Sequence, residues 1–181
     1  GAMYRSLALT ALRDGVSTDD GKRLGEIAGR LPIALADGTV ELGGEDVSEA
    51  IRAPEVSTAA SEVSVHREVR TAMVARQREL IDTGRYVAEG RDIGTVVSPD
   101  APLKVFLTAA PAERARRRAA DTGEDAAAVA AAQAERDERD TVREHGALRA
   151  ADDSVEIDTT GLRIAEVVEQ IAALARERGL A

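Results

Sequence analysis

Residues 90–94, Gly-Arg-Asp-Ile-Gly, carry side chains that are well suited to bind a charged ligand. They follow directly on residues 86–89, a short run with β-strand character. Ligands in open α/β sheets bind beyond the carboxyl ends of strands, and glycines let the backbone bend and approach a ligand closely. Arg91 offers a phosphate clamp, and Asp92 offers a hydrogen-bond acceptor. The alternative is a tight turn whose two charges are solvated or paired with each other.

Three charged side chains share one face of a predicted helix. Arg136, Asp140 and Arg143 are spaced i, i+4 and i+7 within the alanine-rich residues 125–145. Residues 135–140 otherwise read Glu-Arg-Asp-Glu-Arg-Asp, which is typical of a solvated helix with many salt bridges. The spacing is therefore compatible with two interpretations, a ligand-binding face and an ordinary charged surface.

Two further groups of polar residues carry weaker signals. Ser61 precedes a predicted helix that carries Arg70, a pair that says little by itself. Four arginines stand just before a break at residues 121–123, namely Arg114, Arg116, Arg117 and Arg118. Because guanidinium groups bind phosphate in a bidentate way, such a cluster can close over phosphates as a lid. Ordinary surface charge is the alternative.

Composition excludes several classes of site and partner. The 181 residues contain no cysteine, which rules out disulfides and thiolate chemistry and fits the cytoplasm, and two histidines, too few for a histidine-rich metal site. The net charge of -9 argues against binding to nucleic acid or to anionic membranes. No apolar run approaches the length of a transmembrane helix, and the N-terminus has no stretch of signal-peptide type. The sequence contains two lysines and 22 arginines. It contains three aromatic residues, so we expect an aliphatic core.

The elements that must position these residues begin with helices and a hairpin. Apolar spacing predicts helices over residues 3–14 and 19–30. Asp-Gly at residues 37–38, between short alternating runs, predicts an antiparallel hairpin over residues 33–42. Around Pro54 the chain turns helical again. Residues that follow this helical spacing are Val65, Val69, Met73, Arg76 and Leu80.

From residue 85 onward the pattern predicts strands that alternate with helices. Strands are expected at residues 86–89, 103–108 and 154–158. Helices are expected at residues 111–120 and 125–145, and a C-terminal amphipathic helix is marked by Ile164, Val167, Val168, Ile171 and Leu174. This alternation predicts an α/β fold with a parallel sheet.

Taken in this order, the segments resemble bacterial cytidylate kinases essentially from the first residue to the last. The strings that carry the resemblance are residues 1–5 (Gly-Ala-Met-Tyr-Arg), 44–47 (Gly-Glu-Asp-Val), 51–52 (Ile-Arg), 55–56 (Glu-Val), 90–97 (Gly-Arg-Asp-Ile-Gly-Thr-Val-Val), 99–104 (Pro-Asp-Ala-Pro-Leu-Lys), 136–140 (Arg-Asp-Glu-Arg-Asp) and 157–160 (Ile-Asp-Thr-Thr). The stretch from residue 90 to residue 104 is the most specific, and the others corroborate it.

The resemblance implies the α/β fold of P-loop nucleoside monophosphate (NMP) kinases. Its parallel-sheet core would comprise residues 1–30 and 61–181, with a short lid at about 114–135, and residues 31–60 would form a small antiparallel NMP-binding insert. One departure is large. Such kinases begin with a strand and a Gly-x-x-x-x-Gly-Lys-Ser/Thr loop, and these 181 residues contain neither. We therefore expect the sequence to be a truncated, inactive form of an enzyme that is monomeric when complete.

The activity implied by the resemblance is transfer of the ATP γ-phosphoryl group to CMP or dCMP, with Mg²⁺, giving CDP or dCDP in the cytoplasm. The catalytic residues that the resemblance implies are Arg5, Arg91 and Arg143, which are expected to bind the acceptor phosphate. The residues expected to bind the substrate are Tyr4, Ser61, Arg70, Asp92, Arg136 and Asp140. Candidates for the lid are Arg114, Arg117 and Arg118. No protein metal ligands, nucleic acid or membrane partner are expected.

Base chemistry gives these assignments a physical reason. Cytosine carries an amino donor beside acceptors at N3 and O2, so a carboxylate and a guanidinium can read one edge together. Asp92, Arg70 and Ser61 match the family positions for this readout, and Asp140 would accept from the ribose hydroxyls. Uracil carries a carbonyl in place of the amino group, and a carboxylate would repel it. The alternative function is a regulatory module that binds CMP without catalysis.

Overall fold

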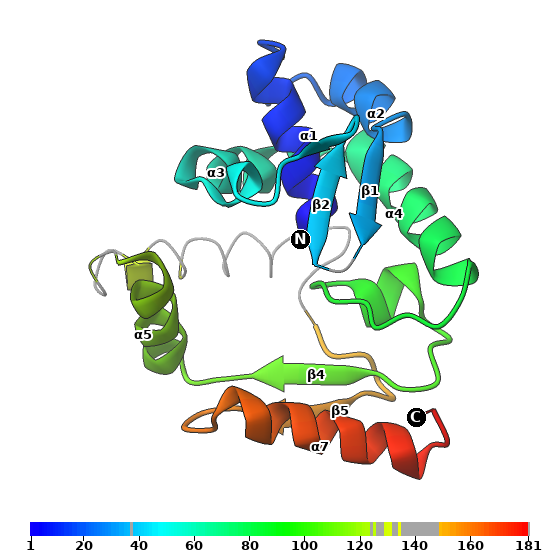
Figure 1. The fold of residues 1–181 in the computed structure, drawn as a ribbon, viewed down its shortest axis with the longest axis vertical. Helices are drawn as coiled ribbons and strands as arrows, with labels where there is room; N and C mark the ends of the chain where they lie inside the picture. Colours follow the sequence, from blue (N-terminus) through cyan, green and yellow to red (C-terminus); the bar gives the residue numbers. More distant parts are fainter. Residues whose placement is uncertain (37, 124, 126–128, 132–133, 135–148, 181) are drawn as a thin grey trace. The chain divides into compact units, whose positions relative to one another are not determined.

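Two units make up the chain, Gly1–Gly90 and Arg91–Ala181 (Figure 1). The computed structural model describes residues 1–36, 38–123, 125, 129–131, 134 and 149–180. In this part of the chain, none of the helices is long and apolar enough to span a membrane.

Four α-helices build most of the first unit. They are α1 (Ala2–Arg13), α2 (Gly21–Gly29), α3 (Pro54–Val63) and α4 (Arg67–Asp82). Local signals set their ends. The Asp20 side chain accepts a hydrogen bond from the backbone N–H of Arg23 and caps α2, and Pro54 starts α3 at a position that needs no N–H donor. The helices predicted over residues 3–14 and 19–30 are therefore confirmed.

The helical spacing that began at Val65 was wrong at its first residue. Helix α3 ends at Val63, and α4 starts after His66, whose extended backbone leads into the new helix. Val65 lies in this break with 54% of its surface exposed, whereas Val69 and Met73 are fully buried. The reason is tertiary, because α3 packs on α1 while α4 packs on α2, and one straight helix cannot reach both partners.

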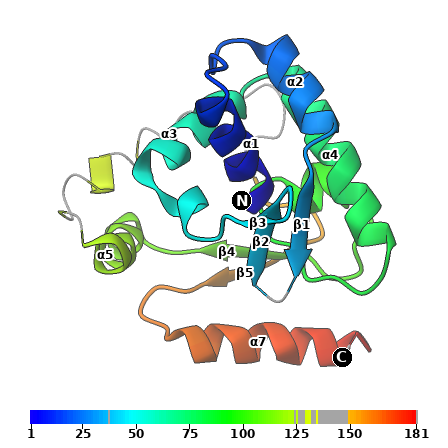
Figure 2. The ribbon, with the colours of Figure 1, turned by 45° about the horizontal axis from the view of Figure 1, so that its top comes forward.

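A three-stranded antiparallel sheet lies between α2 and α3 in the sequence (Figure 2). Its strands are β1 (Ile33–Ala36), β2 (Thr39–Leu42) and β3 (Glu45–Asp46). Ile33 pairs with Leu42 and Ala36 with Thr39, so the predicted hairpin is confirmed. Gly38 in its turn has a φ of 81°, a conformation that favours glycine. Asp37, the other residue of the predicted turn, lies outside the described residues.

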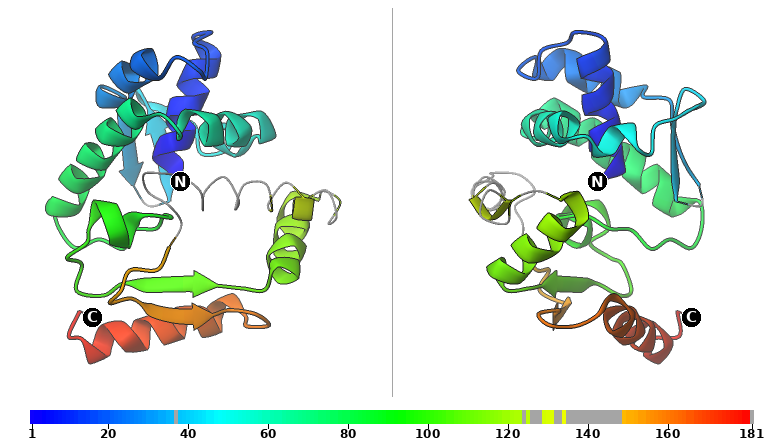
Figure 3. Two further views of the ribbon diagram at one scale, coloured as in Figure 1. Left: turned by 180° about the vertical axis from the view of Figure 1, so that it is seen from behind. Right: turned by 60° about the vertical axis from the view of Figure 1, so that its left-hand side comes forward.

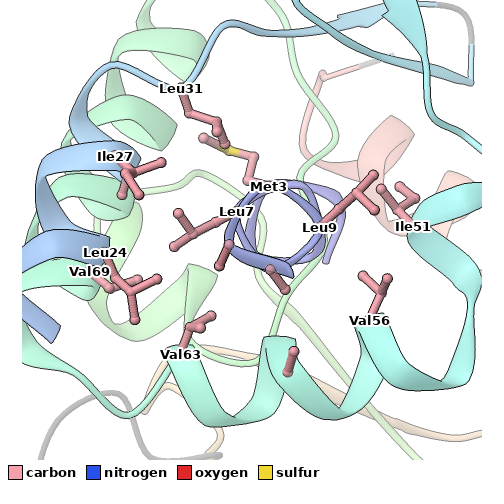
Figure 4. Close-up of a cluster of buried hydrophobic side chains, with 14 of the residues drawn as sticks. Met3, Leu7, Leu9, Leu24, Ile27, Leu31, Ile51, Val56, Val63 and Val69 are labelled. Carbon is pink, nitrogen blue, oxygen red and sulfur yellow. The ribbon is translucent and has the colours of Figure 1, made fainter. Parts of the chain in front are cut away.

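Helix α1 is at the centre of an aliphatic core (Figure 4). It lies between α3 on one side and α2 with α4 on the other in Figures 1 and 2. Figure 4 shows Leu7 directed toward Leu24, and Leu9 directed toward Ile51 and Val56. Buried residues occupy most of its circumference, namely Met3, Ser6, Leu7, Ala8, Leu9 and Ala11. A helix that is buried over most of its circumference has little freedom to rotate or slide.

The second unit contains a pair of parallel strands, as the alternating pattern predicts. They are β4 (Val105–Thr108) and β5 (Val155–Asp158), and Val105 pairs with Val155 and Thr108 with Asp158. Figure 3 shows their arrows pointing the same way. The other elements of this unit include η2 (Ile93–Val97), α5 (Pro111–Thr122) and α7 (Ile164–Glu177). This mixed α/β architecture, with a small antiparallel sheet and a parallel one, agrees with the predicted NMP-kinase-like fold class.

The strand predicted at residues 86–89 is wrong. These residues are irregular, with Tyr86 56% and Val87 98% exposed. A strand needs a hydrogen-bonded neighbour, and none of the described strands pairs with this segment. Tyr86 and Val87 therefore give the segment strand propensity without a sheet to join.

Helix α5 continues two residues beyond its predicted end at about residue 120. It ends after Thr122 at Gly123, whose φ of 72° stops it, so the break predicted at residues 121–123 falls on the last of these residues. In α7 the predicted apolar stripe is partly open, since Ile164 is 84% and Val168 57% exposed. Most of the helix predicted over residues 125–145 lies outside the described residues.

The central position of α1 predicts a large difference between two leucines on that helix. Leu7 is fully buried and Leu12 is 45% exposed. Replacing Leu7 by Ala leaves a cavity in the core, so the free energy of unfolding should fall by about 2–5 kcal/mol. Leu12→Ala is the matched control and should cost less than about 1 kcal/mol. Urea titrations monitored by circular dichroism measure both, and equal losses would contradict this account of the core.

Candidate functional site

Asp92 begins an unusually wide turn of the backbone. Its carbonyl accepts hydrogen bonds from the backbone N–H groups of Thr95, Val96 and Val97 at 3.3, 2.9 and 3.3 Å. The turn continues as the π-helical segment η2, which is closed when the N–H of Ser98 donates to the carbonyl of Ile93 at 2.8 Å. π-Helical turns are rare in proteins, and those that occur are often found at functional sites. Asp92 therefore stands at the start of a tightly bonded turn, and whether the segment binds a ligand stays a prediction.

Arg91 and Asp92 are both half-buried at the beginning of the second unit. Since the turn fixes the backbone of Asp92 through several hydrogen bonds, the two side chains leave the chain from a defined position. A carboxylate and a guanidinium that are adjacent in sequence and partly shielded from water suit the recognition of a polar, charged ligand.

Four predicted site residues lie in the first unit. Tyr4 and Arg5 are on α1, Ser61 is on α3 and Arg70 is on α4. Arg5 donates from Nη1 to the carbonyl of Ile51 at 3.5 Å, and Tyr4 packs partly buried against the core. Because α1 is fixed by the core, these two side chains have a rigid base.

Ser61 and Arg70 are both buried, each with 8% of its surface exposed. The carbonyl of Ser61 accepts a hydrogen bond from Oγ of Ser64 at 2.8 Å, where α3 ends. Arginine is seldom buried to this extent unless its guanidinium is hydrogen-bonded or paired. Arg70 is therefore not an ordinary surface charge of α4.

Three predicted site residues, Arg136, Asp140 and Arg143, lie outside the described residues, so the choice between a binding face and a charged surface remains a prediction for them. Of the remaining ones, the structure groups four in the first unit and puts Arg91 and Asp92 at the start of the second.

A family model described as cytidylate kinase matches residues 1–177. The chain belongs to the cytidylate kinase family. It is 49% identical to a cytidylate kinase of Solibacter usitatus over 185 residues, an alignment that covers 98% of this chain and 80% of that protein. A cytidylate kinase of Geobacter sulfurreducens is 43% identical, with the same coverage. A bifunctional pantoate ligase/cytidylate kinase of Synechococcus sp. is 44% identical over 98% of this chain and 39% of that protein.

Membership in the cytidylate kinase family confirms the resemblance inferred from the motifs, and with it the general class of nucleotide-binding transferases of kinase type. The matched range includes each residue that the sequence singled out as a candidate. The individual roles of these residues stay predictions.

One arginine of the α5 cluster, Arg117, is hydrogen-bonded to other parts of the second unit. Arg117 donates from Nη1 to Oγ1 of Thr159 at 3.0 Å, and from Nη2 to the carbonyls of Thr159 and Leu162 at 2.5 and 3.3 Å. Its Nε donates to Glu113 at 2.8 Å. These bonds hold α5 against the loop that follows β5. Arg114 and Arg118, the other two lid candidates, are half-buried on the same helix.

Threonine side chains connect the carboxyl ends of β4 and β5. The carbonyl of Thr108 accepts from both the N–H and Oγ1 of Thr159 at 2.8 and 2.9 Å. Oγ1 of Thr160 accepts from the N–H of Ala110 at 2.8 Å and donates to Asp158 at 2.6 Å. Sequence reasoning singled out the string at residues 157–160 but gave it no role. Its signal was the pair of threonines directly after a strand, because their hydroxyl groups can form hydrogen bonds with backbone groups of the loop.

The described residues contain no cluster of three or more acidic or histidine side chains that could hold a metal ion. The printed sequence also has no Gly-x-x-x-x-Gly-Lys-Ser/Thr string, the kind of loop whose hydroxyl contacts Mg²⁺ in P-loop enzymes.

The ion pairs of Glu113 predict a low titration midpoint. Hydrogen bonds from Arg116 and then Arg117 stabilise its carboxylate and lower its pKa from 4.5 to about 2. Because the pKa is lower in the folded than in the unfolded chain, the stabilisation is complete above pH 4.5 and is lost as the pH falls toward 2. NMR titration of the carboxyl carbon should therefore give a midpoint near 2.

Two variants test the cause of this shift. Arg116→Ala and Arg117→Ala should each move the midpoint of Glu113 upward, since each removes one of the hydrogen bonds that favour the carboxylate. Glu113→Gln should be less stable than the wild type at neutral pH, with the difference vanishing near pH 2. A wild-type midpoint close to 4.5 would show that the ion pairs do not persist in solution.

Proposed function

We propose that this protein phosphorylates CMP or dCMP, transferring the γ-phosphoryl group of ATP to give CDP or dCDP. The observation that carries the proposal is the match to the cytidylate kinase family over residues 1–177. The bonded turn at Asp92 supports it, because the most specific string of the sequence forms this turn.

Phosphoryl transfer asks mainly for positioning and for neutralisation of charge on the phosphoryl oxygens. Guanidinium groups suit that task, since their donors match phosphate oxygens two at a time. We assign this role to Arg5, Arg91 and Arg143. The rigid base of Arg5 on α1 supports the assignment, because a clamp loses effect when it can drift.

Recognition of the base is assigned to three residues. Asp92 would accept a hydrogen bond from the exocyclic amino group of cytosine, and Arg70 and Ser61 would donate to the acceptors on the same edge. The burial of Arg70 and Ser61 supports this reading, because polar groups in a shielded site reject a mismatched partner strongly. Tyr4 would flank the nucleotide, and Arg136 and Asp140 would bind the sugar.

The division of labour along the chain follows the same proposal. Residues 31–60 would form the insert that receives the monophosphate, and residues 114–135 would form a lid carrying Arg114, Arg117 and Arg118. ATP would serve as phosphoryl donor with Mg²⁺, whose role is to neutralise charge on the donor phosphates. The bonds of Arg117 to the loop after β5 give this arginine a structural task beside any contact with phosphate.

Substitution of Asp92 tests the reading of the base. Asp92→Asn removes the charge and adds an amide donor, so the preference for CMP over UMP should collapse. A charged hydrogen bond of this kind contributes about 1.5–3 kcal/mol, which corresponds to about one to two decades in relative kcat/KM. The measurement is a coupled assay with both nucleotides, on a polypeptide in which the family's phosphate-binding loop precedes residue 1.

Arg143→Ala is the matched control for this experiment. Since the phosphate group carries no base identity, this variant should weaken activity toward CMP and UMP by the same factor. If Asp92→Asn lowered both activities equally, Asp92 would be a structural or phosphate-side residue, and the assignment of base recognition would fail.

The printed sequence itself predicts a second result. A polypeptide of residues 1–181 alone should have negligible CMP kinase activity, because it offers no backbone cradle for the β- and γ-phosphates of ATP. Addition of the family's strand and loop in front of residue 1 should restore ADP production that depends on CMP. If activity did not return while CMP still bound, the protein would be the CMP-binding regulatory module instead.

A further inference from the structure

We propose that Lys104 is a positioning residue for the turn that starts at Asp92, and through it a determinant of base selectivity. The inference rests on the proposed function, since it gives Asp92 the role of reading the base. Its structural part, the support of the turn by Lys104, stands on contacts within the second unit alone.

Lys104 is a buried lysine in a chain that contains only two. Its side chain is 8% exposed, whereas Lys22 is at the surface. A buried ammonium must be hydrogen-bonded, because its desolvation is otherwise costly. Nζ of Lys104 donates to Oδ1 of Asp153 at 2.7 Å and to the carbonyl of Pro99. The bond from Lys104 also lowers the pKa of Asp153, which keeps that carboxylate ionised.

The methylene groups of Lys104 pack near the start of the turn, at Gly94. A Cβ placed on Gly94 would lie 3.3 Å from Cδ of Lys104, which is tighter than ordinary contact, and 3.5 Å from its Cγ, which is an ordinary contact. Gly94 is not among the glycines with positive φ, so its backbone does not demand glycine. Space limits it instead, because a Cβ at this position would push the lysine stem aside by a few tenths of an ångström.

These contacts give one side chain a hold on both ends of η2. Its stem lies against Gly94 near the start, and its ammonium binds the carbonyl of Pro99 just past the end. The backbone of Lys104 is itself fixed to the sheet, since its carbonyl accepts from the N–H of Val155 at 2.9 Å. Lys104 therefore holds the turn, and with it the carbonyl of Asp92, next to the start of β4.

This arrangement has a consequence for recognition. A carboxylate distinguishes an amino group from a carbonyl only while it is held at hydrogen-bond distance in the correct direction. A displacement of about 1 Å at a reacting or binding group can cost about two decades in efficiency. Loss of the support at Lys104 should therefore relax selectivity, although Lys104 itself makes no contact that reads the base.

The test compares Lys104→Met with Lys22→Met, which removes the same charge from the surface. Both are made in the polypeptide that carries the family's phosphate-binding loop, and the Kd values for CMP and UMP are measured by calorimetry. Lys104→Met should reduce the ratio of the two Kd values about ten-fold. It should also speed hydrogen exchange at the amides of Thr95, Val96 and Val97, which bond to the carbonyl of Asp92. Lys22→Met should change neither quantity.

A folded Lys104→Met protein with an unchanged Kd ratio and unchanged exchange would overturn the proposal. If this variant does not fold, Gly94→Ala replaces it, because the added methyl group presses on the same lysine stem and should give the same two effects. Failure of the proposed function is recognised separately, since Asp92→Asn would then leave the Kd ratio unchanged. In that case hydrogen exchange alone decides whether Lys104 supports the turn.

Discussion

The burial of α1 in an aliphatic core is the constraint on which the first unit depends. With three aromatic residues in the sequence, this core is assembled from leucine, isoleucine, valine, alanine and methionine that close around one helix. Small and branched side chains must interlock to reach native packing density, and this leaves the helix a single register. Tyr4 and Arg5 inherit that register, so two candidate ligand-binding side chains are placed by their apolar neighbours.

The second unit uses a different means of cohesion. Its buried apolar residues within the described ranges are few, namely Val97, Ala115, Val129 and Ile157. Charged and hydroxyl groups connect its parts, with Arg117 bonded to the loop after β5 and Lys104 bonded to Pro99 and Asp153. Such polar bonds contribute little net stability but are directional. They suit a region where loops must be held at fixed positions beside a ligand.

Local signals account for what the sequence predicted correctly. The hairpin followed from an Asp-Gly turn, and β4 and β5 from short apolar runs, because turn chemistry and propensity act over a few residues. The strand expected at residues 86–89 failed because pairing depends on a partner elsewhere in the chain. Val65 failed for a similar reason, since the choice of packing partner ended α3 before it. The motifs singled out candidate ligand residues, but they did not show the π-helical form of the turn at Asp92. They also did not show the bonds of Lys104 to Asp153 and of Arg117 to Thr159, which join residues far apart in the sequence.

The contact between Gly94 and Lys104 also has an evolutionary side. A residue with a Cβ at position 94 would push the lysine stem at position 104 by a few tenths of an ångström, and a shorter residue at position 104 would forfeit the bonds to Pro99 and Asp153. Neither position can drift alone without a loss that the other must compensate. In divergent descendants of this chain the two positions should be inherited as a pair, and where one has changed the other should have changed with it.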